Sequence, residues 1–565
     1  MSKFLATLGM SASAVLLAAC SSGSDDAPAT PPASTAPAAT VATYLPAQGE
    51  KAAYIDTRLQ LTFDAPPVLG TSGTIKVYKN DGTLVDTIDV SNAIVTAGAE
   101  TQTVMPAANT EIDTIGKNVA NLTAWRYVYY KPVTIAGNTA TIKLHDNVLA
   151  YDTDYYVLMD PGTLVGRSNG APLTAVSVPR SWSFHTRTAP ASKTAVTVDD
   201  DGAADFRSVQ GALNWIMANG CTATACANAA DAKTITIKNG TYNEMLFIRN
   251  VNNLTITGES RAGVLVQYDN YESYNPGTGG SKTAVQTALT NELGASRRAV
   301  GGGRAVLLVE GADMLKLSNF TLKNSHVKQT IYNNQAETIY YNTSTLNGSR
   351  WLATNMNFIS AQDTIQTKGW AWIYQSYIAG DVDFIWGSPF AVLFEESELH
   401  TVFDPTQAAA TYSGGYLFQA RDTYGYPGFV VLNSSLTADA NVPAGSTFLA
   451  RSGGNTVEKG YCTTMLTSGS LANANYYCDN IAYINNKVGP HIASAGWYTA
   501  PLPNPLVPSD STGWRESGST DLNGKPLDVS GRTPYALTNG DLSAVNTRTK
   551  VFAGWNSGAG WVPAP

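Results

Sequence analysis

The chain has 565 residues, more than one hydrophobic core usually supports, so we expect two folded domains. Charged residues make up 14 %, the formal net charge is −8 and the sequence pI is about 5.2. A surface of this kind, without any Lys/Arg-rich run, excludes nucleic acid as a general partner. The abundance of Gly, Ser, Thr and Asn is typical of β-rich extracellular proteins.

The first forty residues predict export and anchoring. Lys3 precedes an apolar run, 4–19, that is short for a membrane span. The run ends in Leu17-Ala18-Ala19-Cys20, which resembles a bacterial lipobox, so we expect a lipoprotein signal peptide at 1–19 and a lipidated Cys20. The alternative is an ordinary signal peptide with a chance cysteine. Ser21 favours the outer membrane, and the Ala/Pro/Thr/Ser composition of 20–40 predicts a disordered tether.

The remaining cysteines suggest disulfides, because an even number is usual in an exported chain. Three pairings are possible, and we expect the two that are local in sequence. A zinc site is the alternative, but the five histidines are scattered, so no metal is expected. The four residues are Cys221, Cys226, Cys462 and Cys478.

Residues 41–188 alternate short apolar strands with turn signals, which predicts an all-β sandwich. Asn80-Asp81-Gly82 is expected to be a hairpin turn between two of the strands. The start at Tyr44 and the ending Trp182-Ser183-Phe184 are similar to bacterial Ig-like modules that precede secreted enzymes. We therefore expect an Ig-like domain here, joined at about 188–193 to the next domain.

One motif in this predicted domain matches a sequence pattern of serine hydrolases. Gly166-Arg167-Ser168-Asn169-Gly170 matches G-x-S-x-G, which has catalytic meaning only on a strand-to-helix turn of an α/β sheet. Here the motif lies between predicted strands, where Gly and Asn are ordinary turn residues. We therefore interpret it as a hairpin loop.

From residue 195 to 565 the pattern changes to a repeat. A helix is predicted over Phe206–Ala218, followed by strands that resemble one another, whose last apolar residues are 36, 20, 21 and 37 positions apart. A period near 20 with insertions is typical of a solenoid, and predicts a right-handed parallel β-helix. The similar strands lie at 317–322, 353–358, 373–378, 393–399 and 431–436.

Two acidic motifs occur one coil apart. Gln362-Asp363-Thr364 and Asp381-Val382-Asp383 place Asp363 and Asp383 20 residues from each other. Stacked strands lie roughly 4.8 Å apart, so the two carboxylates should be neighbours with different pKa values. Such a pair suits nucleophilic attack combined with acid/base catalysis. Gln335 and Arg451 lie about one coil before and three coils after the pair, as candidates for an oxyanion donor and a charge partner.

These motifs, taken in order, resemble those of the pectin methylesterase (pectinesterase) family. The resemblance covers about two-thirds of the chain, from Ala195 to Asn556, and the lipobox is similar to the bacterial lipoprotein members. It rests on Gly240-Thr241-Tyr242-Asn243-Glu244, Gln335-Ala336, Gln362-Asp363-Thr364, Asp383-Phe384-Ile385-Trp386-Gly387 and the stretch from Gly428-Phe429-Val430 to Leu449-Ala450-Arg451.

The resemblance implies a role for each matching residue. Asp383 would attack the methyl ester carbonyl of galacturonate, and Asp363 would act as acid and then as base. Gln335 and Gln362 would hold the oxyanion, and Arg451 would pair with Asp383. The implied enzyme is a carboxylic ester hydrolase that converts pectin to pectate and methanol without a cofactor. We expect a monomer whose partners are the polysaccharide and, through Cys20, a membrane.

The sequence departs from the family at one functional position. The arginine motif usually continues with Pro and Trp, whereas Ser452 and Gly453 follow here. The aromatic residues that bind the sugar must then lie elsewhere, and the candidates are Trp386, Trp370 and Trp372. Because this Trp is absent, a different ester or thioester remains an alternative substrate. A Gly-rich insertion at 268–303 has no predicted role. A different β-helix pectinolytic activity and a non-catalytic adhesin are two further hypotheses for the chain.

Overall fold

The protein is described from a computed structural model. It covers residues 44–91, 108–120, 122, 124–220, 232–275, 303–408, 411–423, 425–452, 479–499 and 506–565. The predicted lipidation at Cys20, the four other cysteines and most of the Gly-rich insertion lie outside these residues. Within the described ranges, no helix has the length and apolar character needed to span a membrane. Residues 42–565 form one compact unit.

The N-terminal part is built from antiparallel sheets that share a core. Side chains from both larger sheets meet in one buried cluster around Leu61, Val77, Tyr155 and Phe184, which is the arrangement of a β-sandwich. One sheet has the order β1(Tyr44–Leu45)-β3(Leu59–Thr62)-β10(Thr139–Ile142)-β9(Val133–Ala136). The other has the order β2(Glu50–Ala53)-β14(Ser183–Thr186)-β11(Asp154–Met159)-β5(Thr74–Lys79)-β6(Leu84–Asp89), with β2 and β14 parallel.

Both predicted hairpin loops are confirmed. Strands β5 and β6 pair antiparallel around Asn80-Asp81-Gly82. The G-x-S-x-G segment joins β12(Leu164–Ser168) to β13(Ala171–Leu173), which pair antiparallel beside β4(Val68–Leu69). Asn169 and Gly170 have φ angles of 50° and 76°, as the tight turn between these strands requires. The Ser168 hydroxyl donates to the Thr62 carbonyl, so it holds two strands together.

Another hairpin belongs to the N-terminal part by sequence but packs against the following domain. It is formed by β7(Glu111–Ile115) and β8(Arg126–Tyr130). Val128 and Tyr130 lie in a buried cluster with Phe247 and Leu308 of the parallel sheets. The buried Arg126 side chain donates to the carbonyls of Leu246, Gly303 and Ala305, which are at 2.9, 2.9 and 2.5 Å. The two predicted domains therefore share an extensive contact.

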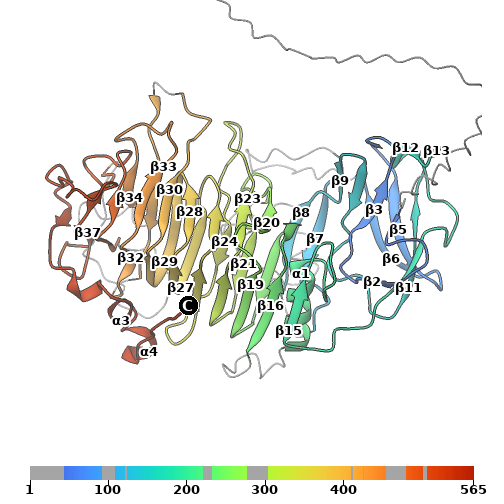
Figure 1. Cartoon of the computed structure of the whole chain (residues 1–565), viewed down its shortest axis with the longest axis horizontal. Coiled ribbons are helices and arrows are strands. Elements are labelled where there is room, and N and C mark those ends of the chain that lie inside the picture. Colours follow the sequence, from blue (N-terminus) through green and yellow to red (C-terminus); the bar gives the residue numbers. More distant parts are fainter. Residues whose placement is uncertain are drawn as a thin grey trace, which may run out of the picture. The chain divides into compact units, whose positions relative to one another are not determined.

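From Ala195 onward the strands stack in parallel, as the predicted β-helix requires (Figure 1). One sheet has the main order β15(Ala195–Val198)-β16(Lys233–Ile237)-β19(Leu254–Gly258)-β22(Leu315–Ser318)-β25(Arg350–Thr354)-β27(Ile365–Tyr374)-β29(Val382–Glu395)-β32(Gly428–Leu432)-β35(Ile481–Ile484)-β37(Trp514–Ser517)-β39(Ala536–Thr538). A column beside it contains β18(Leu246–Arg249)-β21(Leu307–Glu310)-β24(Ile339–Tyr341), then β27 and β29, then β31(Tyr416–Ala420)-β34(Phe448–Ser452). The second sheet has the order β17(Gly240–Asn243)-β20(Val264–Tyr268)-β23(Thr321–Asn324)-β26(Asn357–Ile359)-β28(Tyr377–Gly380)-β30(Glu398–Thr401)-β33(Ser435–Ala438)-β36(Lys487–Val488)-β38(Thr520–Asp521).

The repeated strands predicted from the sequence are each divided by a turn. At Asn319, Asn355, Gln375, Glu396 and Asn433 the backbone has a positive φ of 48–63°, which ends one strand and starts the next on the other sheet. These polar side chains stack on successive coils, since Asn355 donates to Asn319 at 2.7 Å and Gln375 to Glu396 at 3.0 Å. Alternating apolar residues continue through the turn because both strands face the same interior. For that reason the sequence pattern resembles a single strand.

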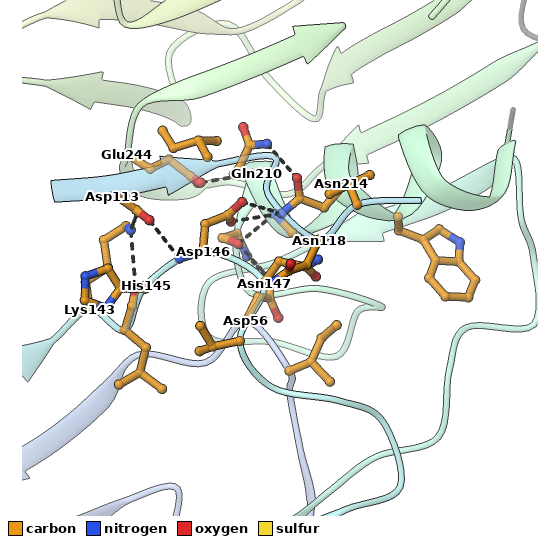
Figure 2. Close-up of a pocket in the computed structure, with 18 of the residues that line it drawn as sticks. Asp56, Asp113, Asn118, Lys143, His145, Asp146, Asn147, Gln210, Asn214 and Glu244 are labelled. Carbon is orange, nitrogen blue, oxygen red and sulfur yellow. Dashed lines mark hydrogen bonds and ion pairs between the residues drawn. The ribbon is translucent and has the colours of Figure 1, made fainter. Parts of the chain in front are cut away.

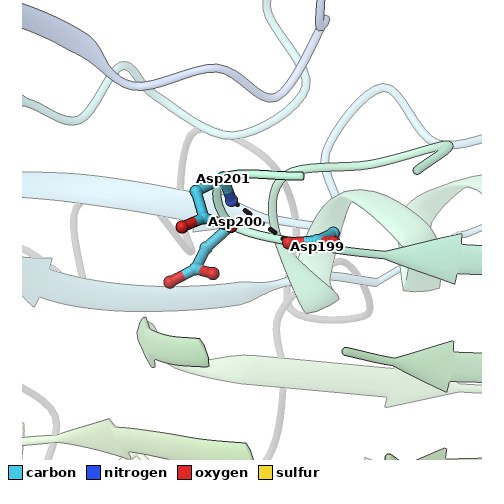
Figure 3. Close-up of side chains that lie close together, drawn as sticks. All are labelled: Asp199, Asp200 and Asp201. Carbon is cyan, nitrogen blue, oxygen red and sulfur yellow. Dashed lines mark hydrogen bonds between the residues drawn. The ribbon is translucent and has the colours of Figure 1, made fainter. Parts of the chain in front are cut away.

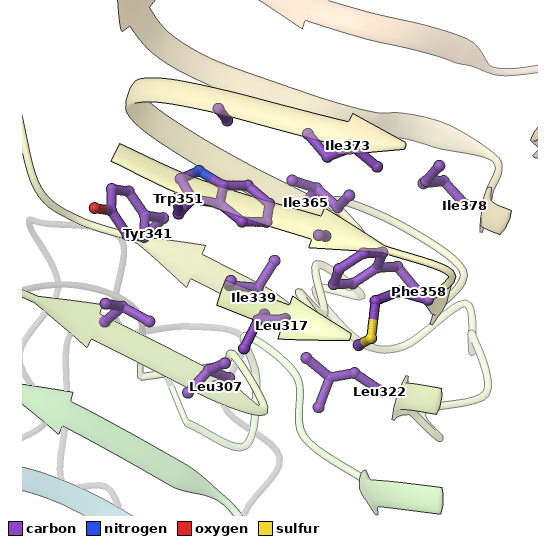
Figure 4. Packing of buried hydrophobic residues seen from close by; sticks show 14 of the residues in the cluster. Leu307, Leu317, Leu322, Ile339, Tyr341, Trp351, Phe358, Ile365, Ile373 and Ile378 are labelled. Atoms are coloured by element: carbon purple, nitrogen blue, oxygen red, sulfur yellow. The ribbon is translucent and has the colours of Figure 1, made fainter. Parts of the chain in front are cut away.

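The interior of the β-helix is a continuous stack of apolar side chains. Leu317, Ile339, Phe358, Ile365 and Ile378 come from successive coils and are fully buried (Figure 4). The predicted helix forms as α1(Val209–Trp215), continued by the π-helix η1(Ile216–Gly220), and its apolar face joins this core at the first coil. Short helices follow near the C-terminus, namely η5(Ser543–Val545), α3(Arg548–Val551) and α4(Trp555–Gly558).

Candidate active site

The two predicted catalytic aspartates lie on neighbouring coils. Gln335 forms a parallel bridge to Gln362, which forms another to Val382. The Asp363 amide donates to the Val382 carbonyl at 3.1 Å, so Asp363 and Asp383 follow directly after these paired positions, where β27 and β29 begin. Both aspartates have a positive φ, 60° and 50°. This conformation is uncommon for a side-chain-bearing residue and is often found at functional sites.

A cavity of about 360 Å³ opens at this position, and all five residues predicted to be catalytic line it. Asp363 and Asp383 are only 7 % and 4 % exposed, which means that they are shielded from bulk water but lie at the cavity wall. We call this the aspartate cavity. Its lining residues are Arg304, Gln335, Tyr340, Gln362, Asp363, Gln366, Lys368, Asp383, Trp386, Gly387, Ser388, Gln419, Arg421 and Arg451.

Asp383 is held by two side chains from later coils. Arg451 donates from Nε to Asp383 Oδ1 at 2.7 Å and from a terminal nitrogen to Oδ2, a two-point ion pair. Gln419, paired in register with Arg451, donates to the same Oδ2 at 3.0 Å. Such a fork fixes the orientation of a carboxylate as well as its charge. The predicted Arg451–Asp383 pair is therefore present in the structure.

Asp363 has a different environment. Its Oδ2 accepts from Arg304 at 2.7 Å, but Arg304 also binds Glu337 at 2.8 Å and Glu272 at 3.0 Å. One guanidinium is thus shared by three carboxylates. Burial raises the pKa of Asp363 well above its usual value, Arg304 opposes this shift, and the charges of Glu337 and Asp383 add to it. Asp363 is therefore suited to carry a proton at a pH where an ordinary aspartate has lost it.

The side chains of Gln335 and Gln362 line the cavity, and the buried Oε1 atom of Gln335 has no hydrogen-bond partner within the described residues. Glutamines that lie beside an acyl carbon can stabilise the negative charge on its oxygen by donating N–H bonds. Their backbones are fixed by the parallel bridges on either side of Gln362. The geometry is compatible with the oxyanion role that the family resemblance implied.

Of the three tryptophans predicted to bind substrate, one lies at the aspartate cavity. Trp386 lines the aspartate cavity and is 8 % exposed, with Arg304 and Arg421 at 5.8 and 5.5 Å from its ring. Trp370 and Trp372 are fully buried in a separate cluster and are absent from the cavity lining. They are removed from the candidate set because C-terminal segments cover that face of the sheet.

Sequence reasoning missed Arg304, Gln419 and Arg421. Arg304 directly follows the Gly-rich insertion, so no count of residues could have placed it opposite Asp363. Gln419 and Arg421 could have been found from the stacking of coils. Gln419 precedes Arg451 by 32 residues, which is one coil with an insertion, and the two strands pair in register. Arg421 donates to Gln419 at 2.7 Å and thereby orients the amide that binds Asp383.

Acidic side chains also gather in a second cavity, of about 260 Å³, between the sandwich and α1 (Figure 2). We call it the helix-cap cavity. Asp56 accepts from the Arg207 and Ser208 amides at 2.9 and 2.7 Å, and Glu244 accepts from the Val209 and Gln210 amides at 2.9 and 3.0 Å. These carboxylates satisfy the free N–H groups at the start of α1.

A third acidic group is on the surface. Oxygens of Asp199, Asp200 and Asp201 lie within 4.8 Å of one another (Figure 3). Asp199 accepts from the Gly202 amide at 2.8 Å and Asp200 from the Thr241 amide at 3.0 Å, so both carboxylates stabilise turns. We assign no metal to this group, and the expectation that no metal is needed stays a prediction.

Comparison with known proteins is consistent with the resemblance of the motifs. No protein-family model matches the chain. A pectinesterase from Ralstonia solanacearum is 27 % identical over 268 residues, and one from Ralstonia nicotianae is 28 % identical over 261. Each alignment covers 44 % of this chain and 61 % of the relative, so the chain spans about three fifths of the length of these curated relatives. Among solved structures, pectin methylesterase PemA from Erwinia chrysanthemi matches with a TM-score of 0.46 and 21 % identity, over 65 % of this chain and 99 % of that one. Through its two sequence relatives, the chain is identified as a homologue of the pectinesterases.

Proposed function

We propose that the protein is a carboxylic ester hydrolase that removes methyl esters from pectin. The observation that carries this proposal is the pair of aspartates on neighbouring coils of the β-helix, in one cavity but with different partners. Asp383 is clamped by Arg451 and Gln419, whereas Asp363 has a raised pKa. The two groups are thereby prepared for different tasks, one as nucleophile and one as proton donor.

In the first step, Asp383 attacks the carbonyl carbon of the methyl ester. The carbonyl π pair moves to the oxygen, where N–H groups of Gln335 and Gln362 stabilise the negative charge. Collapse of this intermediate breaks the bond to the methoxy group, which takes the proton of Asp363 and leaves as methanol. The product is an anhydride between Asp383 and the uronate.

In the second step, ionised Asp363 takes a proton from water, whose oxygen attacks the uronate carbonyl of the anhydride. The bond to Asp383 breaks, and the products are an ionised Asp383, a protonated Asp363 and a free uronic acid, which releases its remaining proton to solvent. The net reaction consumes one water and one ester and gives one acid and one methanol. Arg451 balances the charge of Asp383 whenever that group is ionised.

The direct test is methanol release from highly methyl-esterified pectin by the purified full chain. We expect methanol and titratable acid to appear in equal amounts. If pectin yields an ultraviolet-absorbing unsaturated product or no methanol, the proposal is wrong.

We also propose that the enzyme is an exported lipoprotein of the outer membrane with an Ig-like N-terminal domain. The Leu17-Ala18-Ala19-Cys20 signal and Ser21 support this location. Replacement of Cys20 by Ala should move the protein from the membrane fraction to the soluble fraction. Retention of the Cys20→Ala variant in the membrane would contradict a lipid anchor at this residue.

A further inference from the structure

A third cavity, of about 510 Å³, lies where the sandwich meets the β-helix. We call it the tyrosine cavity. From the sandwich side it is lined by Arg58 and Lys131, and from the β-helix side by Tyr268, Tyr271 and Tyr332. Its wall therefore combines residues of two domains, and the sandwich contribution lies outside the stretch of chain that resembles the pectinesterases.

The chemistry of this wall suits an acidic sugar. Tyr271 stacks on His326 with ring centroids 3.9 Å apart and lies 5.0 Å from the ring of Tyr332, which gives a rigid aromatic platform. Such rings bind the apolar faces of pyranoses, and their hydroxyl groups bond to sugar hydroxyls. Lys131 is exposed and forms no ion pair within the described residues.

The other charged groups of this wall leave the balance positive. The Arg58 side chain donates to the Asn243 carbonyl at 2.5 Å and, among the described residues, pairs with no carboxylate. Lys143 is already paired with Asp113. Asp269 also lines the cavity, with a carboxylate that is 60 % exposed and 3.2 Å from the His326 ring, so it offsets one of the two positive charges. Arg58 and Lys131 therefore remain for a ligand carboxylate.

The tyrosine cavity adjoins the aspartate cavity across one short segment. Tyr271 faces the tyrosine cavity, whereas the next residue, Glu272, binds Arg304 at 3.0 Å. The Glu272 amide donates to the Gln335 carbonyl at 2.9 Å. Tyr332 and Gln335, which line the two different cavities, are three residues apart in the chain, a span of at most about 10 Å. The backbones of the two cavity walls are therefore separated by less than the length of a short oligosaccharide.

From this juxtaposition we propose that the tyrosine cavity is a subsite for an unesterified uronate of the same polymer whose ester is hydrolysed in the aspartate cavity. The sandwich thereby becomes part of the substrate-binding surface. The proposal deepens the proposed esterase function and rests on it. It predicts that the protein prefers long chains that already carry free carboxylates, because those bind Lys131 and Arg58 in addition to the reacting unit.

The test compares three variants of the full chain, Lys131→Glu, Tyr332→Ala and the control Lys51→Glu. Lys51 is an exposed lysine of β2 that lines neither cavity. Binding of a long unesterified oligogalacturonate is measured by calorimetry, and KM and kcat are measured on partly esterified pectin and on a methyl-esterified monomer. We expect Lys131→Glu to weaken oligogalacturonate binding about fivefold or more at low salt, with a smaller loss at high salt.

Tyr332→Ala should weaken the same binding without that salt dependence, because it removes contact area rather than charge. On pectin, both variants should raise KM more than they lower kcat, and the loss should exceed the loss on the monomer. If Lys131→Glu behaves like Lys51→Glu while methanol is still released, the subsite is wrong and the esterase stands. If no substrate yields methanol but oligogalacturonate binding depends on Lys131, the esterase is wrong and the binding cavity stands.

Discussion

The aspartate cavity and the helix-cap cavity both contain carboxyl groups with raised pKa values, but they use them differently. In the helix-cap cavity, burial raises the pKa of Asp56 to about 6, and its Oδ2 atom accepts from the backbone N–H groups of Arg207 and Ser208. In the aspartate cavity, burial raises the pKa of Asp363, but its partner is the side chain of Arg304, which is shared with two glutamates. One arrangement holds a helix, and the other keeps a proton ready for transfer.

A raised pKa therefore identifies a carboxyl group as buried, but not as catalytic. What separates the two cavities is the kind of group that binds each carboxylate. Asp363 and Asp383 are bound by the guanidinium groups of Arg304 and Arg451, whereas Asp56 and Glu244 in the helix-cap cavity accept from backbone N–H groups. Both cavities contain a buried oxygen without a partner among the described residues, Gln335 Oε1 in one and Asp56 Oδ1 in the other, so an unpartnered polar atom alone does not identify the site.

The largest expected difference between the two cavities follows from replacing one carboxylate in each of them. Asp383→Asn should lower kcat at least about 10³-fold, because an amide cannot form the anhydride. Asp56→Asn should leave kcat within about twofold and lower the melting temperature, because the cap of α1 is weakened. Methanol release and thermal unfolding on both variants measure the two effects. Comparable losses of kcat in both variants would remove the distinction.

The next effect concerns the fork that holds Asp383. Arg451→Ala should lower kcat about 10²-fold, because the nucleophile loses both its charge partner and its fixed orientation. Arg451→Lys restores a positive charge but not the two-point contact, so it should recover only part of the loss. The comparison of the two variants by kcat separates charge from geometry. Equal activity of Arg451→Lys and the wild type would show that orientation is unimportant.

The pH profile should report the proton on Asp363. Because burial raises the pKa of Asp363 and methanol departs with its proton, kcat should fall about tenfold per pH unit above that pKa. Glu272→Gln removes a carboxylate that competes for Arg304, so the guanidinium should lower the pKa of Asp363 and shift the alkaline limb to lower pH by up to about one unit. A limb that moves to higher pH would contradict this assignment.

These residues also show how far sequence reasoning reaches. The repeat of about 20 residues located Asp363 and Asp383 because neighbouring coils align in register. It placed Arg451 three coils after the pair, whereas the pairing of β29 with β31 and of β31 with β34 places it two coils after Asp383, because the intervening loops are longer than the repeat allows. It could not locate Arg304, which follows an insertion, nor reveal that Trp372 is covered by Arg548, 4.3 Å from its ring and far away in sequence. Local periodicity determines which residues share a face of the β-helix. What later covers that face depends on tertiary contacts that leave no local pattern.

A smaller effect concerns the helix-cap cavity and the dependence of the unfolding free energy on pH. Burial raises the pKa of Asp146 from 3.8 to about 7, and the charge of Asp113 adds to the shift. The folded protein therefore binds this proton more tightly than the unfolded chain, and the resulting stabilisation is complete below about pH 4 and is lost as the pH rises through about 7. Asp146→Asn should be more stable than the wild type at pH 8 by about 1 kcal/mol, with a flatter profile. Urea unfolding at pH 5 and pH 8 measures this difference, and a profile as steep as that of the wild type would assign the titration to another group.

The smallest effect separates the tryptophans of the two cavities. Trp215, in the helix-cap cavity, donates from Nε1 to the Ser192 carbonyl at 2.9 Å, whereas Nε1 of Trp386 has no partner among the described residues. Trp215→Phe should therefore cost about 1 kcal/mol in unfolding free energy through the lost hydrogen bond. Trp386→Phe should cost less and instead change kcat/KM on pectin by about twofold to fivefold, because a smaller ring remains beside Arg304 and Arg421. If Trp386→Phe proves the more destabilising of the two, the Trp386 ring supports the fold rather than the binding of substrate.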